Sequence, residues 1–193
     1  MRHSAAGPIA LFATAALFAG AAFAQANASN NDIMSGDASL THPLNTKSAM
    51  QGQIVTVQLT NTIHTRDGVE LPRGTQLLGK VDAVKSAKDH GPAKLALTFS
   101  QARLKDGKTF PIKATLVNYS SANDDGGTPL PVHPDSVIDE AGPIGDTRLH
   151  SAVKEEVSGT LTSQRGDIKL PEGTQFLVAV DVVQSPGNIG GAN

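Results

Sequence analysis

The alternation of apolar and polar residues is the clearest pattern in this chain. It occurs in "IVTVQLT" (54–60), in "LALTFS" (95–100) and in "FPIKATLVNY" (110–119). A period of two residues places all the apolar side chains of a segment on one face of a β-strand. The pattern therefore predicts several strands, each with one buried face.

Turn signals separate these segments. Asp67-Gly68 in "TRDGV" and Asp106-Gly107 in "LKDGK" are dipeptides typical of tight β-hairpins. Pro111 follows the second of them and has no N–H to donate to a neighbouring strand, which indicates a sheet edge or a bulge. The order of strands and turns predicts antiparallel pairing.

One phrase occurs twice, as "LPRGTQLLGKVDAV" (71–84) and "LPEGTQFLVAVDVV" (170–183), with an offset of 99 residues (170 − 71). Each copy has an apolar start, a turn and a long alternating strand. Proline fixes its own φ and glycine accepts a positive φ, so both copies predict the same tight turn. We expect Gly74 and Gly173 to hold equivalent positions with positive φ. The predicted structural turn residues are Pro72, Gly74, Thr75, Pro171, Gly173 and Thr174.

Together these features predict a mainly β fold, a small antiparallel β-barrel or sandwich. Closure of a barrel removes the bare strand edges that invite aggregation. Leu149, Val153 and Val157 are four residues apart, a spacing that predicts a short helix near 147–157.

The first residues have the pattern of a secretory signal peptide, which we assign to 1–24. Arg2 and His3 precede an apolar run from Ile9 to Ala24 that ends in the small-residue sequence Ala-Phe-Ala. The run is Ala-rich and shorter than the roughly 20 apolar residues of a spanning helix. The expected location is therefore periplasmic or secreted, with no spanning segment after cleavage. An uncleaved membrane anchor remains the alternative.

Composition shifts divide the rest of the chain. A polar stretch without periodicity predicts a disordered leader at 25–39. The β-domain would begin with 40–119 and close with 147–184. Between these parts, 120–146 is rich in Gly, Pro, Asp and Ser and predicts a flexible insert. Residues 185–193 predict a flexible tail.

Charge and composition exclude several kinds of function. The chain has 16 Lys and Arg against 18 Asp and Glu, and its net charge is −2. It has no basic block, so it lacks the positively charged patch typical of nucleic-acid-binding proteins. It has no cysteine, which excludes disulfides, thiol catalysis and thiolate metal sites. Aromatic residues make up only 4%, too few for stacking platforms or for the aromatic girdles of an outer-membrane barrel.

Three segments, "GVELPRGTQLLGKVDAV", "FSQARLKDGKTFPI" and "IKLPEGTQFLVAVDVV", together resemble the C-terminal β-barrel domain of the VirB10/TrbI family. Proteins of that family are subunits of type IV secretion and conjugation channels. The similarity spans roughly 46–183, with a gap over the insert. The chain departs from the family in three ways: its predicted signal is cleaved, it lacks a proline-rich stalk, and it has no pair of amphipathic helices. The resemblance implies a bacterial β-barrel, and a channel role only as an alternative.

Candidate catalytic and metal-binding residues are few. Ser151 and Lys154 fit the S-x-x-K pattern, in which lysine lies one helical turn from a serine nucleophile. The companion motifs of such enzymes are missing, so chance is the simpler interpretation. The acidic and histidine residues of the insert lack the spacing of a helical metal site and do not form a calcium loop. These residues are His133, Asp135, Asp139, Glu140 and the stretch 123–127.

The sequence therefore predicts an exported, non-enzymatic β-domain of the bacterial cell envelope with a structural or interaction role. We expect no cofactor and no metal, and as partner a protein of the cell envelope. Strand edges, the insert or the leader would supply the contacts. The alternatives are a subunit or accessory of a type IV secretion channel and a serine hydrolase using Ser151 and Lys154.

Overall fold

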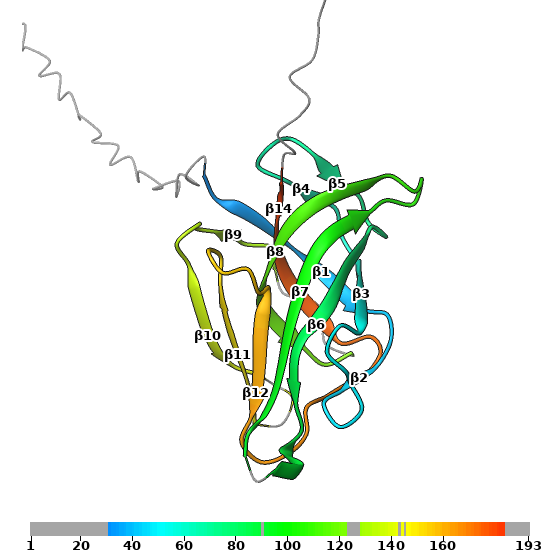
Figure 1. Ribbon diagram of the computed structural model, residues 1–193. Coiled ribbons are helices and arrows are strands. Elements are labelled where there is room, and N and C mark those ends of the chain that lie inside the picture. The colour runs from blue at the N-terminus through cyan, green and yellow to red at the C-terminus, as the bar shows by residue number, and fades with distance from the viewer. Residues whose placement is uncertain (1–30, 90, 123–127, 143, 145, 184–193) are drawn as a thin grey trace, which may run out of the picture.

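The computed structural model describes residues 31–89, 91–122, 128–142, 144 and 146–183 (Figure 1). The predicted signal peptide (1–24) and tail (185–193) lie outside these residues. The strands are β1 Ile33–Leu40, β2 Leu44–Asn45, β3 Ile54–Leu59, β4 Ile63–His64, β5 Glu70–Leu71, β6 Gln76–Lys85, β7 Ala93–Arg103, β8 Thr109–Ser120, β9 Pro131–Val132, β10 Val137–Ala141, β11 Thr147–Ala152, β12 Gly159–Ser163, β13 Lys169–Leu170 and β14 Gln175–Val182, with a 3-10 turn at Ala87–Asp89.

Six of these strands form a closed antiparallel barrel, in the order β7-β6-β3-β1-β14-β8, which the pairing of β7 with β8 completes (Figure 1). The predicted mainly β fold with antiparallel strands is therefore confirmed, and of the two predicted forms the barrel is the one found. In the described part of the chain no helix is long and apolar enough to cross a membrane.

Large apolar side chains fill the interior of the barrel. The alternating segments supply them, as predicted, because every second residue of a strand faces inward. Phe99, Tyr119 and Phe176 are the largest of the fully buried side chains. The rings of Tyr119 and Phe176 lie 6.4 Å apart between centroids, in a tilted arrangement. Tyr119 also shares a hydrogen bond with the Thr147 hydroxyl, which satisfies its buried O–H.

The two copies of the repeated phrase form equivalent turns, as predicted. Gly74 has φ 89° and Gly173 has φ 85°. In both turns the threonine after the glycine donates twice to the proline carbonyl. The N–H distances are 3.0 Å at the first turn and 3.1 Å at the second, and both hydroxyl distances are 2.7 Å.

Each turn is hydrogen-bonded to the last residue of a barrel strand, which is β3 at the first turn and β1 at the second. The glycine N–H donates to the carbonyl of the last residue of that strand, Leu59 for Gly74 and Leu40 for Gly173, at 2.8 Å in both cases. The N–H of the same leucine donates back, to the carbonyl of the threonine that follows the glycine, again at 2.8 Å. The sequence repeat therefore marks two equivalent junctions between a turn and a strand end.

A local twofold relation between β1 and β3 accounts for this equivalence. The two strands pair antiparallel, with Ser39 opposite Gln58, so a half-turn that exchanges them also exchanges β14 with β6. The short pairs β2–β13 and β4–β5 correspond in the same way. Even the β-bulges match, since the register shifts between Leu78 and Gly79 in β6 and between Leu177 and Val178 in β14.

We predict that valine at Gly74 or Gly173 lowers the free energy of unfolding by about 1–3 kcal/mol, because a β-branched residue is strained at positive φ. Urea denaturation measures the change. Gly166→Ala is the control, since Gly166 has open space around it and φ outside the positive range. A change within about 0.5 kcal/mol at both turns would contradict the prediction.

The barrel opens where β7 and β8 diverge, and strands β12, β11 and β10 extend the sheet beside β7 (Figure 1). Two buried serines form hydrogen bonds at this opening: Ser158 bridges β7 and β8, and Ser151 joins β11 to β8. Ser158 accepts the Phe99 N–H on its hydroxyl oxygen at 2.9 Å and the Leu116 N–H on its carbonyl at 2.7 Å. Ser151 donates its hydroxyl to the Leu116 carbonyl. These contacts replace the strand pairing that is lost at the opening.

The predicted helix near 147–157 is wrong: this region contains strand β11, followed by turns. Burial in β11 follows a period of two, at Thr147, Leu149 and Ser151, and Val153 comes after the strand ends. Leu149 enters the barrel core, whereas Val153 joins a small separate cluster on the outside, where it lies with Ile33 and Val132.

Two other predicted boundaries also need correction. The leader assigned to 25–39 includes most of β1, which lies between β3 and β14. The buried residues in its middle, Ser35, Gly36 and Ala38, are small, so it lacks a strong apolar pattern. The insert assigned to 120–146 includes strands β9 and β10, and β9 pairs with β1.

Candidate functional site

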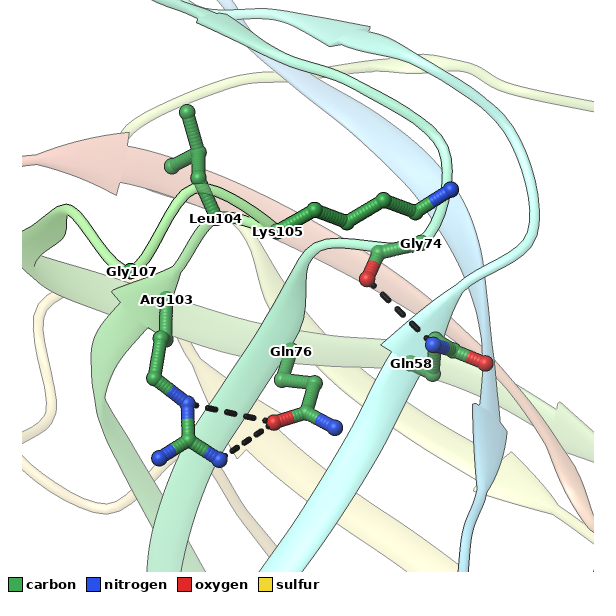
Figure 2. A pocket seen from close by; sticks show the side chains of 7 residues that line it. All are labelled: Gln58, Gly74, Gln76, Arg103, Leu104, Lys105 and Gly107. Carbon is green, nitrogen blue, oxygen red and sulfur yellow. Dashed lines mark hydrogen bonds between the residues drawn. The ribbon is translucent and has the colours of Figure 1, made fainter.

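A shallow pocket of about 280 Å³ lies beside the first turn (Figure 2). Its walls come from the end of β3, the start of β6 and the hairpin that joins β7 to β8. Two glutamines and two cationic side chains contribute polar groups to the lining. The residues that line it are Gln58, Gly74, Gln76, Arg103, Leu104, Lys105 and Gly107.

The hairpin wall is built as the Asp-Gly signal predicted. Gly107 has φ 88°, and its N–H donates to the Leu104 carbonyl at 3.0 Å. The Asp106 carboxylate accepts the Lys108 N–H at 3.0 Å, which fixes the turn. This hydrogen bond is the largest cause that holds the pKa of Asp106 below its usual range. The rigid turn holds the side chains of the hairpin beside the first turn.

Lys105 lies directly over Gly74 (Figure 2). A Cβ atom at position 74 would be only 2.3 Å from the Cε atom of Lys105. Glycine therefore has two roles at this position, since it permits the positive φ and leaves room for the lysine. At the equivalent Gly173 the nearest atom is the Cβ of Ala122, at 3.1 Å, so only the backbone requirement is strong there.

The pocket is rich in donors and cations. Arg103 donates to the Gln76 side-chain oxygen from Nε, at 3.2 Å, and from Nη2. Gln58 donates to the Gly74 carbonyl at 3.3 Å. Asp106 forms an ion pair with Lys108, not with Lys105. Within the ranges that the structure describes, no carboxylate forms an ion pair with Arg103 or Lys105, so their positive charges have no anionic partner.

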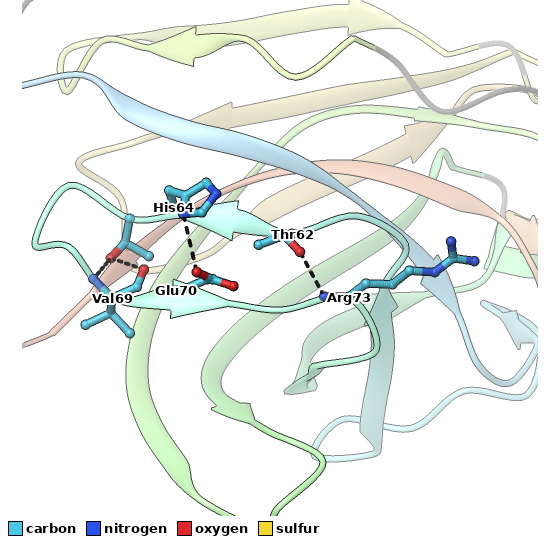
Figure 3. Close-up of polar contacts among 6 residues, drawn as sticks. Thr62, His64, Val69, Glu70 and Arg73 are labelled. Carbon is cyan, nitrogen blue, oxygen red and sulfur yellow. Dashed lines mark hydrogen bonds and ion pairs between the residues drawn. The ribbon is translucent and has the colours of Figure 1, made fainter.

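The turn is anchored on its other side by the β4–β5 hairpin (Figure 3). The Thr62 hydroxyl accepts the Arg73 N–H at 3.3 Å, and the Arg73 side chain extends away from the hairpin. His64 and Glu70 lie opposite each other, 3.9 Å apart, and both are exposed. Arg73 is a further cation of this turn, outside the pocket lining, and it too has no ion-pair partner in the described part of the chain.

A second pocket, of about 110 Å³, lies near the corresponding place beside β14 and β8. Gln175 lines it, as the equivalent Gln76 lines the first pocket. Its charge is opposite, because Asp37 is its charged residue. One carboxylate oxygen of Asp37 is buried without a hydrogen-bond partner, and burial raises the pKa of this carboxyl group above 3.8. The second pocket therefore has a negative charge where the first has two positive charges, and the turn at Gly173 is not part of its lining.

The structure does not bring Ser151 and Lys154 together as the S-x-x-K pattern requires. Ser151 is fully buried, and its hydroxyl donates to the Leu116 carbonyl. The Lys154 side chain is 78% exposed, and its Nζ atom lies 2.6 Å from an oxygen of Asp135. The helix that would align the two residues is replaced by a strand and a turn.

The acidic and histidine residues of the insert are also separated. Asp135 pairs with Lys154, and its N–H donates to the His133 ring at 3.2 Å. Asp139 pairs with His150. Glu140 lies on β10, opposite Leu149 of β11. Among the residues with described positions, no three His, Asp or Glu side chains are grouped to hold a metal ion. The stretch 123–127 lies outside the described residues.

His150 is the residue whose titration we expect to affect stability. Its Nδ1 lies 2.6 Å from Asp139 and its Nε2 3.6 Å from Glu155. The hydrogen bond to Asp139 is the largest cause that raises the pKa of His150 above 6.5. A raised pKa in the folded state stabilises the fold below the unfolded pKa, and the stabilisation is lost as pH rises through the folded pKa.

We predict that the unsubstituted protein loses a little stability as pH rises above about 6.5, and that the His150→Gln variant does not show this loss. The effect is small because all three side chains are exposed. NMR titration of the His150 ring gives its pKa directly, and His64→Gln is the matched control. A His150 pKa at or below its ordinary value would contradict the prediction.

A scan against protein-family models finds no match to this chain, and a search of curated proteins finds no similar sequence. The resemblance to the VirB10/TrbI family therefore stands on the quoted motifs alone.

Proposed function

We propose that this protein is a non-enzymatic binding domain of the bacterial cell envelope, exported to the periplasm or secreted. Its role is structural or interaction-based, and it contacts a protein partner through the face that carries the first turn. The observation that carries the proposal is the pocket beside Gly74, where Arg103 and Lys105 have no anionic partner among the described residues. The barrel presents this pocket on strands and tight turns, which keep binding groups in place.

The interior of the barrel and the candidate catalytic residues support the same proposal. Apolar side chains fill the interior. Ser151 completes the hydrogen bonding of the backbone at the opening between β7 and β8. Lys154 forms an exposed ion pair with Asp135. These residues have structural contacts, and the uncommitted polar groups of the pocket lie on the surface.

Chemical crosslinking in the native host tests the proposal. The full chain, with its own N-terminal segment, is expressed, the envelope is fractionated, and the crosslinked proteins are identified. We expect the chain in the periplasmic or secreted fraction, crosslinked to a specific envelope protein. Recovery in the cytoplasm, or recovery without any specific partner at saturating crosslinker, would contradict it.

A second candidate is a subunit or accessory of a type IV secretion channel. The paired Pro-x-Gly-Thr turns and the closed barrel support it at the level of fold, which does not by itself determine function. Two observations discriminate. Transfer genes beside the coding sequence, together with crosslinking to channel proteins, would favour the channel, whereas crosslinking to other envelope proteins would favour the stand-alone domain.

A further inference from the structure

We infer that the pocket beside Gly74 binds a carboxylate side chain presented by an acidic, extended segment of the partner protein. This inference rests on the proposed function and names the chemistry of the partner at that site. Three features support it: the uncommitted donors of Arg103, the position of Lys105, and the shallow, open shape of the pocket.

Arg103 provides the main recognition group. Both hydrogen bonds that Arg103 donates go to one neutral acceptor, the Gln76 side-chain oxygen. They orient the guanidinium plane and leave Nη1 without a partner in the described part of the chain. A guanidinium has five N–H donors in a fixed planar fork, a geometry that matches a carboxylate. Because the bond to Gln76 holds the fork in place, little side-chain entropy remains to be lost when a carboxylate binds.

Lys105 and Gln58 complete the ligand environment. The aliphatic part of Lys105 crosses the Gly74 turn, and its ammonium group lies on the side of Gln58 (Figure 2). Gln58 donates to the Gly74 carbonyl, so its carboxamide has a fixed orientation. Leu104, partly buried, gives the lining an apolar surface for the methylene groups of an aspartate or glutamate. The pocket thus has one cation from the end of β7, Arg103, and one from the loop that follows it, Lys105.

The shape of the pocket favours a side chain on a partner surface over a free small molecule. Small-molecule sites are clefts that bury most of the ligand and are lined mainly by apolar groups. Here most of the lining side chains are exposed, among them Gln58, Arg103 and Lys105. Nucleic acid is disfavoured because the chain has a net charge of −2 and no basic stripe. A protein segment supplies the additional contact area that so shallow a pocket needs.

The twofold-related pocket provides an internal comparison. It contains Asp37 at its rim and no cationic side chain in its lining, so it would repel an acidic segment. The two pockets share the equivalent residues Gln76 and Gln175 and differ in the sign of their charge. Exposed cations without partners also increase the rate of encounter with an acidic partner at low salt.

The test is a titration of the full exported chain with capped hexaglutamate, followed by NMR of the backbone amides at low salt. We expect saturable binding, with shifts centred on Gln58, Gln76 and Leu104. Arg103→Gln and Lys105→Gln should each weaken binding about tenfold, the effect expected for a lost hydrogen bond to a charged group. Lys169→Gln removes the same charge from an exposed strand position and should change binding less than twofold.

Other outcomes would overturn the inference. Equal weakening by Lys169→Gln would show that net charge alone governs binding. Inhibition by inorganic phosphate at the same concentration as the peptide would identify a site for small anions. Arg103→Lys keeps the charge and loses the planar fork, so full binding by this variant would exclude recognition by the guanidinium. If crosslinking still recovers a partner while hexaglutamate shows no saturable binding, the proposed function stands and this inference falls.

Discussion

Replacement of Phe176 by alanine should lower the free energy of unfolding by about 3–5 kcal/mol, the range typical of aromatic truncations in a well-packed core. Phe176 is fully buried in the barrel and packs against the ring of Tyr119. The barrel is closed, so its wall has little freedom to collapse into the space left by the ring. Urea denaturation followed by circular dichroism measures the loss.

Phe110→Ala is the matched control. Phe110 lies at the start of β8, is only partly buried, and packs at the margin of the same core. We expect it to lose less than half as much stability as Phe176→Ala. A loss below about 1 kcal/mol would mean that Phe176 is not tightly packed on the β1–β14–β8 side of the barrel.

Removal of both buried hydroxyls at the opening of the barrel, in the Ser151→Ala/Ser158→Ala double variant, should cost about 2–6 kcal/mol. Ser158 is the acceptor for the Phe99 N–H, and Ser151 donates to the Leu116 carbonyl. Each buried backbone group left without a partner costs about 1–3 kcal/mol. Because both serines hold the β12–β11 sheet against β8, amide hydrogen exchange should increase first at Leu116 and Phe99.

Ser100→Ala is the control for the two serines, since Ser100 is exposed on β7 next to Phe99. We expect it to be nearly neutral. Ser151→Ala alone also tests the hydrolase alternative with a reactive serine probe. If the double variant unfolds at the same urea concentration as the unsubstituted protein, the two hydroxyls do not join the diverging strands.

Much of the barrel could be predicted from local patterns. The alternation in 54–60, 95–100 and 110–119 marks strands β3, β7 and β8, because each of them buries one face. The two tight turns were predictable from Pro, Gly and Thr, whose backbone preferences do not depend on distant contacts. In both cases a few neighbouring residues determine the local conformation.

Strand β1 could not be predicted, because its burial depends on its neighbours rather than on its own hydrophobicity. Gly36 packs so closely against Ile63 that a Cβ atom would lie 2.4 Å from it. Small residues are required by that close approach, yet in a single sequence small polar residues are also typical of a disordered leader. The helix predicted near 147–157 was wrong because only Leu149 of its three apolar residues lies in a regular element, while Val153 and Val157 lie in the turns after β11.

The two turns that form the candidate pocket were each predictable, but their proximity was not. The turn at Gly74 and the hairpin at Asp106-Gly107 were each expected from local sequence. Their meeting depends on the pairing of β6 with β7, which places Gln76 opposite Arg103. The repeated phrase predicts only the features that the two turns have in common. The chemical difference lies in Lys105, which contacts the first turn from a distant part of the chain.

The position of β1 between β3 and β14 has a consequence for how the chain acquires its structure. The register pairs Ser35 with Ala179, so β1 can pair with β14 only after nearly the whole chain is available. Closing so long a loop costs entropy before any contact compensates for it, and such topologies fold in milliseconds to seconds. The barrel therefore cannot close until β14, the last strand in the sequence, is available to pair with both β1 and β8.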